Sequence, residues 1–411
     1  MKPLLISRPF TDLMLYRISI TLSYQILAVT VGWHIYELTH DVMALGLVGL
    51  AEVIPYFGSA LFAGHAVDHF SKKKIAILGC GIYLFISALM LGVSQSFLIP
   101  LGIRPEWFIY IGIGFAGLAR ALIRPTYQVL FAKALERQDY SRGTAISASI
   151  FQLSMIAGPA LGGALIAWMS LSAAYLATGI FAIVGILSLL NLNYQEEHQP
   201  AQEGSIFSSI GEGLSFVFGQ QIMLAAMALD MFAVLFGGAS SMLPAFIQQI
   251  LQGSPENLGL LRAAPALGST LVGLCLARKP LDQHAGQFLL ASVAAFGLSI
   301  IGFGFSTQFW TAAFFLALTG VFDGVSVVLR TTILQLTTPD QMRGRVSAIN
   351  GLFIGSSNEV GALESGVAAS LLGLAPSIVF GGFMTLLVVA ICSFGAPQLR
   401  KLHLQSLYAK V

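Results

Sequence analysis

The chain has little charge for its length. Only 10% of its 411 residues are Asp, Glu, Lys or Arg, whereas a soluble domain carries about 25%. Hydrophobic residues make up 56% of the chain, and the mean hydropathy is +0.81. This composition excludes an ordinary soluble globular domain and predicts a polytopic membrane protein.

Residues that carry cofactor and metal chemistry are also scarce. The three cysteines, Cys80, Cys275 and Cys392, stand apart in apolar stretches, where we expect small packing residues. His65 and His69 are four residues apart but have no third ligand nearby in the sequence. No phosphate-binding glycine loop ending in Lys-Ser or Lys-Thr is present. We therefore expect no metal, no cofactor, no enzymatic activity and no ATP-driven transport, and the net charge of +2 gives no support for nucleic-acid binding.

The apolar stretches are long and do not alternate with polar residues, which favours helical spans over barrel strands. A spanning helix needs about 20 mainly apolar residues. On that basis the sequence predicts twelve spans, near 11–36, 43–67, 75–95, 107–133, 144–169, 172–194, 217–250, 257–277, 286–306, 309–336, 345–372 and 375–396. The seventh is too long for one crossing, so its first turns are expected at the membrane surface.

Basic residues gather on one side of these spans. Apart from Arg104, the loop and terminal residues Lys2, Arg8, Lys72, Lys73, Lys74, Lys133, Arg137, Arg142, Arg278, Lys279, Arg343, Arg345, Arg400, Lys401 and Lys410 share a side. Under the positive-inside rule this side is cytoplasmic. We expect both termini in the cytoplasm of a bacterial cell, with the chain in the inner membrane.

A polar stretch divides the chain into two similar halves. Residues 195–215 contain the acidic run around Glu196 and predict a cytoplasmic linker between an N-terminal bundle, 1–194, and a C-terminal bundle, 216–411. Gly158 and Gly162 of the fifth span are echoed by Gly361 and Ser365 of the eleventh. Parallel duplication of a six-span unit is one origin of transporter folds.

The turn after the second span carries a motif. It runs from Gly64 through Asp68 to the basic cluster Lys72, Lys73 and Lys74. This stretch resembles the loop signature of the major facilitator superfamily, although His69 and Ser71 depart from it. With twelve spans and a central linker, the resemblance covers nearly the whole chain and implies two six-helix bundles that work by alternating access.

The fifth span carries a second motif, Gly158-Pro159-x-x-Gly162-Gly163. In a membrane helix such residues permit bending and close helix packing. The stretch resembles the motif of the superfamily's proton-coupled exporters, with Ser154 where a glycine usually stands. The segment from Thr337 to Val346 is similar to that of the enterobactin-exporter and macrolide-efflux branch.

A charge at the centre of a spanning helix costs about 2.5–3.5 kcal/mol on insertion scales, so it usually faces the bundle interior. In the superfamily, spans one, four, seven and ten line the central cavity, and here they carry Arg17, Arg120, Asp230 and Asp323. The resemblance makes the acids candidates for proton coupling: Asp230, Asp323, Glu52 and Glu359. The alternative is that these charges pair and only hold the bundle together.

Substrate-cavity candidates come from the same spans. They are Arg17, Tyr24, Arg120, Tyr127, Phe232, Phe236 and Phe314. Because the first half contributes mainly arginines and the second mainly acids, one hypothesis is that the basic half binds an anionic substrate. Aromatic residues also fill helix interfaces, so we expect only about a third of such side chains to contact substrate.

The loop motif is expected to act on conformation. In the superfamily its aspartate faces the start of span eleven, which here places Asp68 near Arg343 and Arg345, with Arg124 close by. An aspartate at a helix N-terminus is favourable by about 0.3–1 kcal/mol. The sequence thus predicts a monomeric, proton-coupled exporter of a small organic molecule, siderophore-like or a hydrophobic drug. Rival interpretations are a metabolite facilitator or importer, a lysophospholipid carrier, and a receptor without transport.

Overall fold

A computed structural model describes residues 8–97, 102, 104–136, 139–193, 206–278, 281, 283–339 and 342–404. Within these ranges, the side chains of residues 61–69, 141, 206–210, 344, 348 and 352 are not described. The described residues form helices and connecting turns, with no strand among them. The chain is therefore an all-α protein, as its composition predicts.

The first half forms six long helices close to the predicted spans. They are α1 (Arg8–Thr39), α2 (Val42–His69), α3 (Lys72–Ser94), α4 (Pro105–Ala134), α5 (Tyr140–Trp168) and α6 (Leu171–Asn191). Local sequence starts two of them. The hydroxyl of Ser71 accepts a hydrogen bond from the Lys74 amide at 3.3 Å, and that of Ser170 from the Ala173 amide at 3.1 Å. These contacts satisfy N–H groups that lack a partner within the helix.

The second half has more elements than its six predicted spans. It contains α7 (Ile206–Gly219), α8 (Gln221–Phe236), the 3-10 helix η4 (Gly238–Met242), α9 (Leu243–Phe246), the π-helical turn η5 (Ile247–Leu251), α10 (Pro255–Arg278), α11 (Ala285–Gly304), α12 (Phe309–Thr337), α13 (Arg343–Leu372), α14 (Leu374–Gly395) and α15 (Pro397–Arg400). All but α7, α8 to η5 and α15 match one predicted span each.

The predicted seventh span, 217–250, corresponds to the membrane stretch Gln221–Leu251, which is not one continuous helix. The chain breaks after Gly219 and again at Gly237, where the 3-10 segment begins. A side chain on Gly238 would lie 2.8 Å from the carbonyl oxygen of Gly361 in α13. The glycines that weaken the helix thus also allow a neighbouring backbone to come close.

The chain folds into two compact units. Unit 1 consists of Met1–Ala44, Leu50–Gln202 and Gly253–Ala263, and unit 2 of Leu45–Gly49, Glu203–Gln252 and Ala264–Val411. The main change of unit, between residues 202 and 203, falls in the acidic stretch of the sequence.

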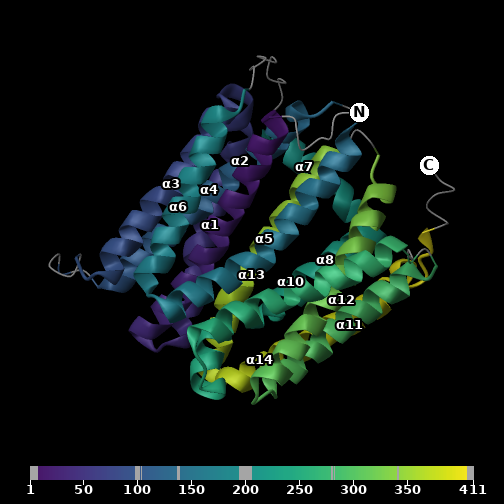
Figure 1. The fold of residues 1–411 in the computed structure, drawn as a ribbon. Coiled ribbons are helices and arrows are strands. Elements are labelled where there is room, and N and C mark those ends of the chain that lie inside the picture. Colours follow the sequence, from purple (N-terminus) through teal and green to yellow (C-terminus); the bar gives the residue numbers. More distant parts are fainter. Residues whose placement is uncertain are drawn as a thin grey trace. The chain divides into compact units, whose positions relative to one another are not determined.

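The two units repeat one packing pattern (Figure 1). In unit 1, α1 packs against α4, α5 and α6, and α3 packs against α4 and α6. In unit 2, α8 packs against α12, α13 and α14, and α11 packs against α12 and α14. Each contact in unit 2 is the counterpart of one in unit 1, as parallel duplication requires.

The echoed glycines have matching places in this pattern. A side chain on Gly158 of α5 would lie 2.5 Å from Cβ of Gln25 in α1, and one on Gly361 of α13 would lie 2.7 Å from the carbonyl oxygen of Leu235 in α8. The sequence echo thus corresponds to two equivalent close helix contacts, one in each unit.

Eleven helical stretches in the described part are long and apolar enough to cross a membrane, with η4, α9 and η5 continuing the stretch that begins with α8. The remaining long helix, α13, has 30 residues but carries Arg343, Arg345, Glu359 and Glu364. With α13 the described chain supplies twelve membrane helices, the number that the sequence predicts.

Candidate transport site

The first polar cluster lies in unit 1, between α2 and α4. Arg120 forms an ion pair with Glu52, and their side chains are 28% and 8% exposed. Gly117 makes this approach possible, because a side chain there would overlap the carbonyl oxygen of Glu52. The Arg120 guanidinium also lies over the ring of Tyr24 at 5.1 Å and that of Tyr56 at 5.5 Å. Arg120 is therefore neutralised by Glu52 and packed between aromatic rings.

The second cluster surrounds Arg17 of α1. Its guanidinium carbon lies 4.1 Å from the centre of the Tyr127 ring and 4.9 Å from that of Phe151. The hydroxyl groups of Tyr127 and Ser147 are 2.6 Å apart, and this hydrogen bond fixes the Tyr127 ring between α4 and α5. Arg17 is half-buried, and its Nε has no hydrogen-bond partner in the described part of the chain.

The third cluster lies in unit 2. Arg330 of α12 forms an ion pair with Asp230 of α8, and the two side chains are only 4% and 8% exposed. Arg330 follows Asp323 by seven residues in α12, so the two lie on one helix face. The structure buries Arg330 and gives it Asp230 as its acidic partner.

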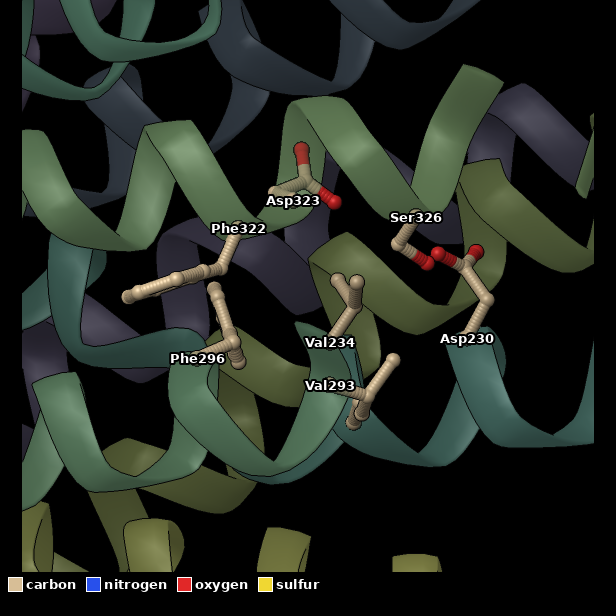
Figure 2. A pocket seen from close by; sticks show the side chains of 8 residues that line it. Asp230, Val234, Val293, Phe296, Phe322, Asp323 and Ser326 are labelled. Carbon is tan, nitrogen blue, oxygen red and sulfur yellow. The ribbon is translucent and has the colours of Figure 1, made fainter. Parts of the chain in front are cut away.

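Asp230 and Asp323 line the same pocket (Figure 2). Asp230 extends from α8, Asp323 and Ser326 extend from α12, and Ser326 points toward Asp230. The remaining lining side chains are apolar: Ala233, Val234, Val293, Phe296 and Phe322. The empty volume, including open solvent, is about 220 Å³, below the roughly 300–1,000 Å³ of drug-sized sites. The pocket therefore suits water or a proton, not an organic substrate.

Asp323 differs from Asp230 in its partners. It is half-buried, and no ion pair or hydrogen bond in the described ranges engages its carboxylate. The sequence groups Asp230 and Asp323 as candidates, and the structure brings these two acids together. Glu52 lies apart in unit 1 with Arg120. Glu359 is half-buried on α13 and does not line the pocket.

The aromatic candidates of unit 2 separate into two kinds. Phe236 packs against the apolar core formed by α8, α11, α12, α14 and α15. Phe232 and Phe314 are exposed, at 40% and 59%, and neither lines the Asp230 pocket. In unit 1, Tyr24 and Tyr127 both contact an arginine.

The residues of the α5 motif face two neighbours. Gly158 and Gly162 lie against α1, where a side chain on Gly162 would be 3.4 Å from Cα of Ile26. Gly163 faces the start of α10, part of unit 1, where a side chain would be 2.6 Å from the Pro255 carbonyl oxygen. The Pro159 carbonyl oxygen lies against Gly259 of the same α10 segment. The motif thus forms close backbone contacts with both helices.

The loop motif is only partly described. The side chains of Gly64 and Asp68 lie outside the described residues, so their contact with α13 stays a prediction. Lys72 is half-buried, and Lys73 donates hydrogen bonds to the carbonyl oxygens of Leu190 and Leu192, each at 3.0 Å. Lys73 thereby binds the end of α6, where carbonyl groups lack helical partners.

The arginines at the same motif have different surroundings. Arg124 and Arg343 are exposed. Arg345 pairs with Glu212 of α7 at 2.5 Å, with side chains 38% and 54% exposed. The start of α13 thus has an acidic partner from the segment between the two predicted bundles.

Sequence reasoning missed Tyr56, Phe151, Ser147 and Glu212. A signal for the clusters of unit 1 was nevertheless present. Arg17 precedes Tyr24 by seven residues, and Arg120 precedes Tyr127 by seven residues. In two antiparallel helices this spacing of about two turns places each arginine opposite the other helix's tyrosine.

Comparison with known proteins agrees with this architecture. The family model "Major Facilitator Superfamily" matches residues 13–282. The multidrug efflux pump Tap of Mycolicibacterium fortuitum is 22% identical over 386 residues, covering 91% of this chain and 92% of its own. The enterobactin exporter EntS of Escherichia coli O1:K1 / APEC is 25% identical over 406 residues, covering 95% and 92%.

A solved structure shares the fold. The crystal structure of a D-xylose-proton symporter aligns with a TM-score of 0.72 at 12% identity and covers 96% of this chain and 99% of its own. At that identity the likeness bears on the fold alone. The family match, the twelve helices and the duplicated packing together show that this chain is a multi-pass membrane transporter that belongs to the major facilitator superfamily.

Proposed function

We propose that this protein exports a small organic molecule, siderophore-like or a hydrophobic drug, across the bacterial inner membrane in exchange for protons, by alternating access. The observation that carries the proton part is the pocket in which Asp323 lies beside the Asp230–Arg330 pair. The two acids Asp230 and Asp323 lie near a single arginine, Arg330. When both acids are ionised, one negative charge among them is therefore not balanced by this arginine.

A proton can remove that remaining charge. A carboxylate in an apolar membrane region is costly, and a buried acid that faces a bundle interior is a usual proton-relay group. Asp230 is neutralised by Arg330, so Asp323 is the acid expected to take up and release the coupling proton. Any rearrangement of α8 against α12 changes the distance between Arg330 and the two acids, which couples protonation to conformation.

The sequence relatives support export as the direction of transport. Tap and EntS are named as an efflux pump and an exporter, and each aligns over more than nine tenths of both chains. The symporter of sugar and protons resembles this chain in fold at 12% identity, which supports no statement on direction. Export is therefore the proposed direction.

The test is transport in proteoliposomes with an imposed pH gradient, using enterobactin and a macrolide as substrates. We expect the gradient to accelerate movement of at least one substrate several-fold. Asp323→Asn should abolish the response to the gradient while substrate exchange without a gradient persists. Ser326→Ala is the matched control, because it lines the same pocket without a titratable group.

Movement that is equally fast with and without the gradient would contradict proton coupling. Failure to move either substrate would contradict the proposed substrate classes. An Asp323→Asn protein that still responds fully to the gradient would assign coupling to another acid.

A further inference from the structure

The two arginine clusters of unit 1 have the same arrangement but differ in net charge. Arg17 of α1 lies over Tyr127 of α4, and Arg120 of α4 lies over Tyr24 of α1. Each is a guanidinium packed on a tyrosine ring of the facing helix. The difference between them is that Arg120 has Glu52 as an ion-pair partner.

Arg17 has no such partner among the described residues. None of the ion pairs in the described part of the chain includes it, whereas Arg120 and Arg330 are each paired with an acid, and Arg262 of α10 donates to the Ala28 carbonyl oxygen. Its Nε is buried without a hydrogen-bond partner among the described residues. A charge held in a membrane helix without compensation is costly, and such residues commonly mark a substrate path.

Aromatic rings surround Arg17, and one of them is exposed. The guanidinium carbon of Arg17 lies over the Tyr127 ring, 4.1 Å from its centre, and 4.9 Å from the centre of the Phe151 ring. Phe151 is itself 39% exposed. A planar guanidinium held on its face still offers N–H groups at its edge, in the fork geometry that matches a carboxylate. The exposed Phe151 ring can stack against an aromatic group of the same ligand.

Arg124 adds to the positive charge of this region. It is exposed and precedes Tyr127 by three residues in α4, so both lie on one helix face. An anion that approaches Arg17 therefore meets two cations from α1 and α4.

We propose that Arg17, packed on Tyr127 and Phe151, binds the acidic group of the substrate, and that the substrate is an anionic organic molecule with an aromatic ring. This inference rests on the proposed function and narrows its substrate class. It moves the anion site from Arg120, which Glu52 neutralises, to Arg17.

The test measures equilibrium binding to the purified full-length protein in neutral detergent, without a membrane or a gradient. The probes are 2-naphthoate and its uncharged counterpart 2-naphthamide, followed by their own fluorescence anisotropy. We expect the naphthoate to bind at least tenfold more tightly than the amide. Arg17→Gln should bring the ratio close to one, and Arg17→Lys, which keeps the charge but not the planar fork, should keep a reduced preference.

Two variants serve as controls. Arg104→Gln removes an arginine whose side chain is 82% exposed, and the binding ratio should stay at the wild-type value. Arg278→Gln removes an exposed arginine at the end of α10, away from Arg17 in the sequence, and the binding ratio should again stay at the wild-type value.

Several outcomes would overturn the inference. They are equal binding of the two probes, no binding of either by the wild-type protein, or an unchanged ratio in a folded Arg17→Gln protein. Competition by phosphatidylglycerol for the naphthoate site would assign Arg17 to a lipid headgroup instead. Because no gradient is applied, this result stands apart from the test of proton coupling: either can fail while the other holds.

Discussion

Charged side chains in a low-dielectric region need partners, and the arginines of this protein show how differently that need can be met. Arg330 is buried against Asp230, with side-chain exposures of 4% and 8%. Arg120 pairs with Glu52 and also lies over two aromatic rings. Arg17 has aromatic rings but no acid in the described part of the chain. At the residue scale, an arginine with an acidic partner is a neutralised pair, whereas an arginine without one in the described chain is a candidate ligand site.

Removal of one partner of the Arg330–Asp230 pair should destabilise unit 2. Loss of one member of a buried pair leaves an uncompensated charge and typically costs about 3–5 kcal/mol. We expect Arg330→Met to lower the unfolding midpoint in detergent strongly and the double variant Arg330→Met/Asp230→Leu to recover most of the loss.

The matched control for that prediction is Arg104→Met. Arg104 is an exposed arginine whose nitrogen lies 3.8 Å from a carboxylate oxygen of Glu106, and its loss should leave the midpoint unchanged. A double variant as unstable as Arg330→Met would show that the ion pair is not the cause.

At the scale of the helices, close contacts depend on small residues. Gly158 brings α5 against α1, and Gly361 brings α13 against α8. Apolar lipid tails offer no hydrophobic advantage to helix association, so close packing of this kind supplies much of the attraction between membrane helices. The same two contacts also explain why the sequence echo falls at glycine in both halves.

A methyl group at either glycine should therefore weaken its unit. Gly158→Ala and Gly361→Ala force atoms into contacts of 2.5 and 2.7 Å, and overpacking of this kind costs about 1–3 kcal/mol. Gly81→Ala in α3 is the control, because nothing lies within 4 Å of that position. There the better helix propensity of alanine should stabilise by up to about 1 kcal/mol. Thermal unfolding of the three purified variants checks the order, and equal midpoints would refute it.

The whole molecule is a duplicated bundle with an uneven distribution of charge. The helices of unit 1 hold Arg17 and Arg120, whereas those of unit 2 hold Asp230 and Asp323. Duplication explains the shared packing pattern. Under the two proposals made above, unit 1 binds substrate and unit 2 handles protons. The first of these roles is tested by naphthoate binding and the second by the pH gradient.

Topology can be tested at the same scale. The asymmetry of basic residues predicts that both termini are cytoplasmic and that the loop containing Gly102 and Arg104 is on the opposite side. A green fluorescent protein fused to either terminus should fluoresce, and alkaline phosphatase inserted after Gly102 should be active. An active phosphatase at the C-terminus would mean an odd number of crossings.

Much of the fold was predictable because the membrane imposes a simple rule. Backbone polar groups must be satisfied within each span, so every long apolar stretch becomes a helix whatever its neighbours. The spans α1 to α6 and α10 to α14 accordingly begin and end close to the predicted residues. The break at Gly237 and Gly238 was not predicted, because these glycines lie where Phe296 of α11 and the backbone of α13 come close.

The sequence by itself determined the class of protein, the twelve helices, the duplication and the short list of membrane charges. Only the tertiary structure decided which of those charges meet. Glu52 and Arg120 are 68 residues apart in the sequence. They come together because Gly117 has no side chain, which lets the backbone of α2 approach α4 closely. Asp230 and Arg330 pair across α8 and α12. Arg17 has no acidic partner in the described part of the chain and lies beside the rings of Tyr127 and Phe151. The ion-pair partner of each charge depends on how side chains of different helices meet. The pattern of residues along a single helix does not give that information.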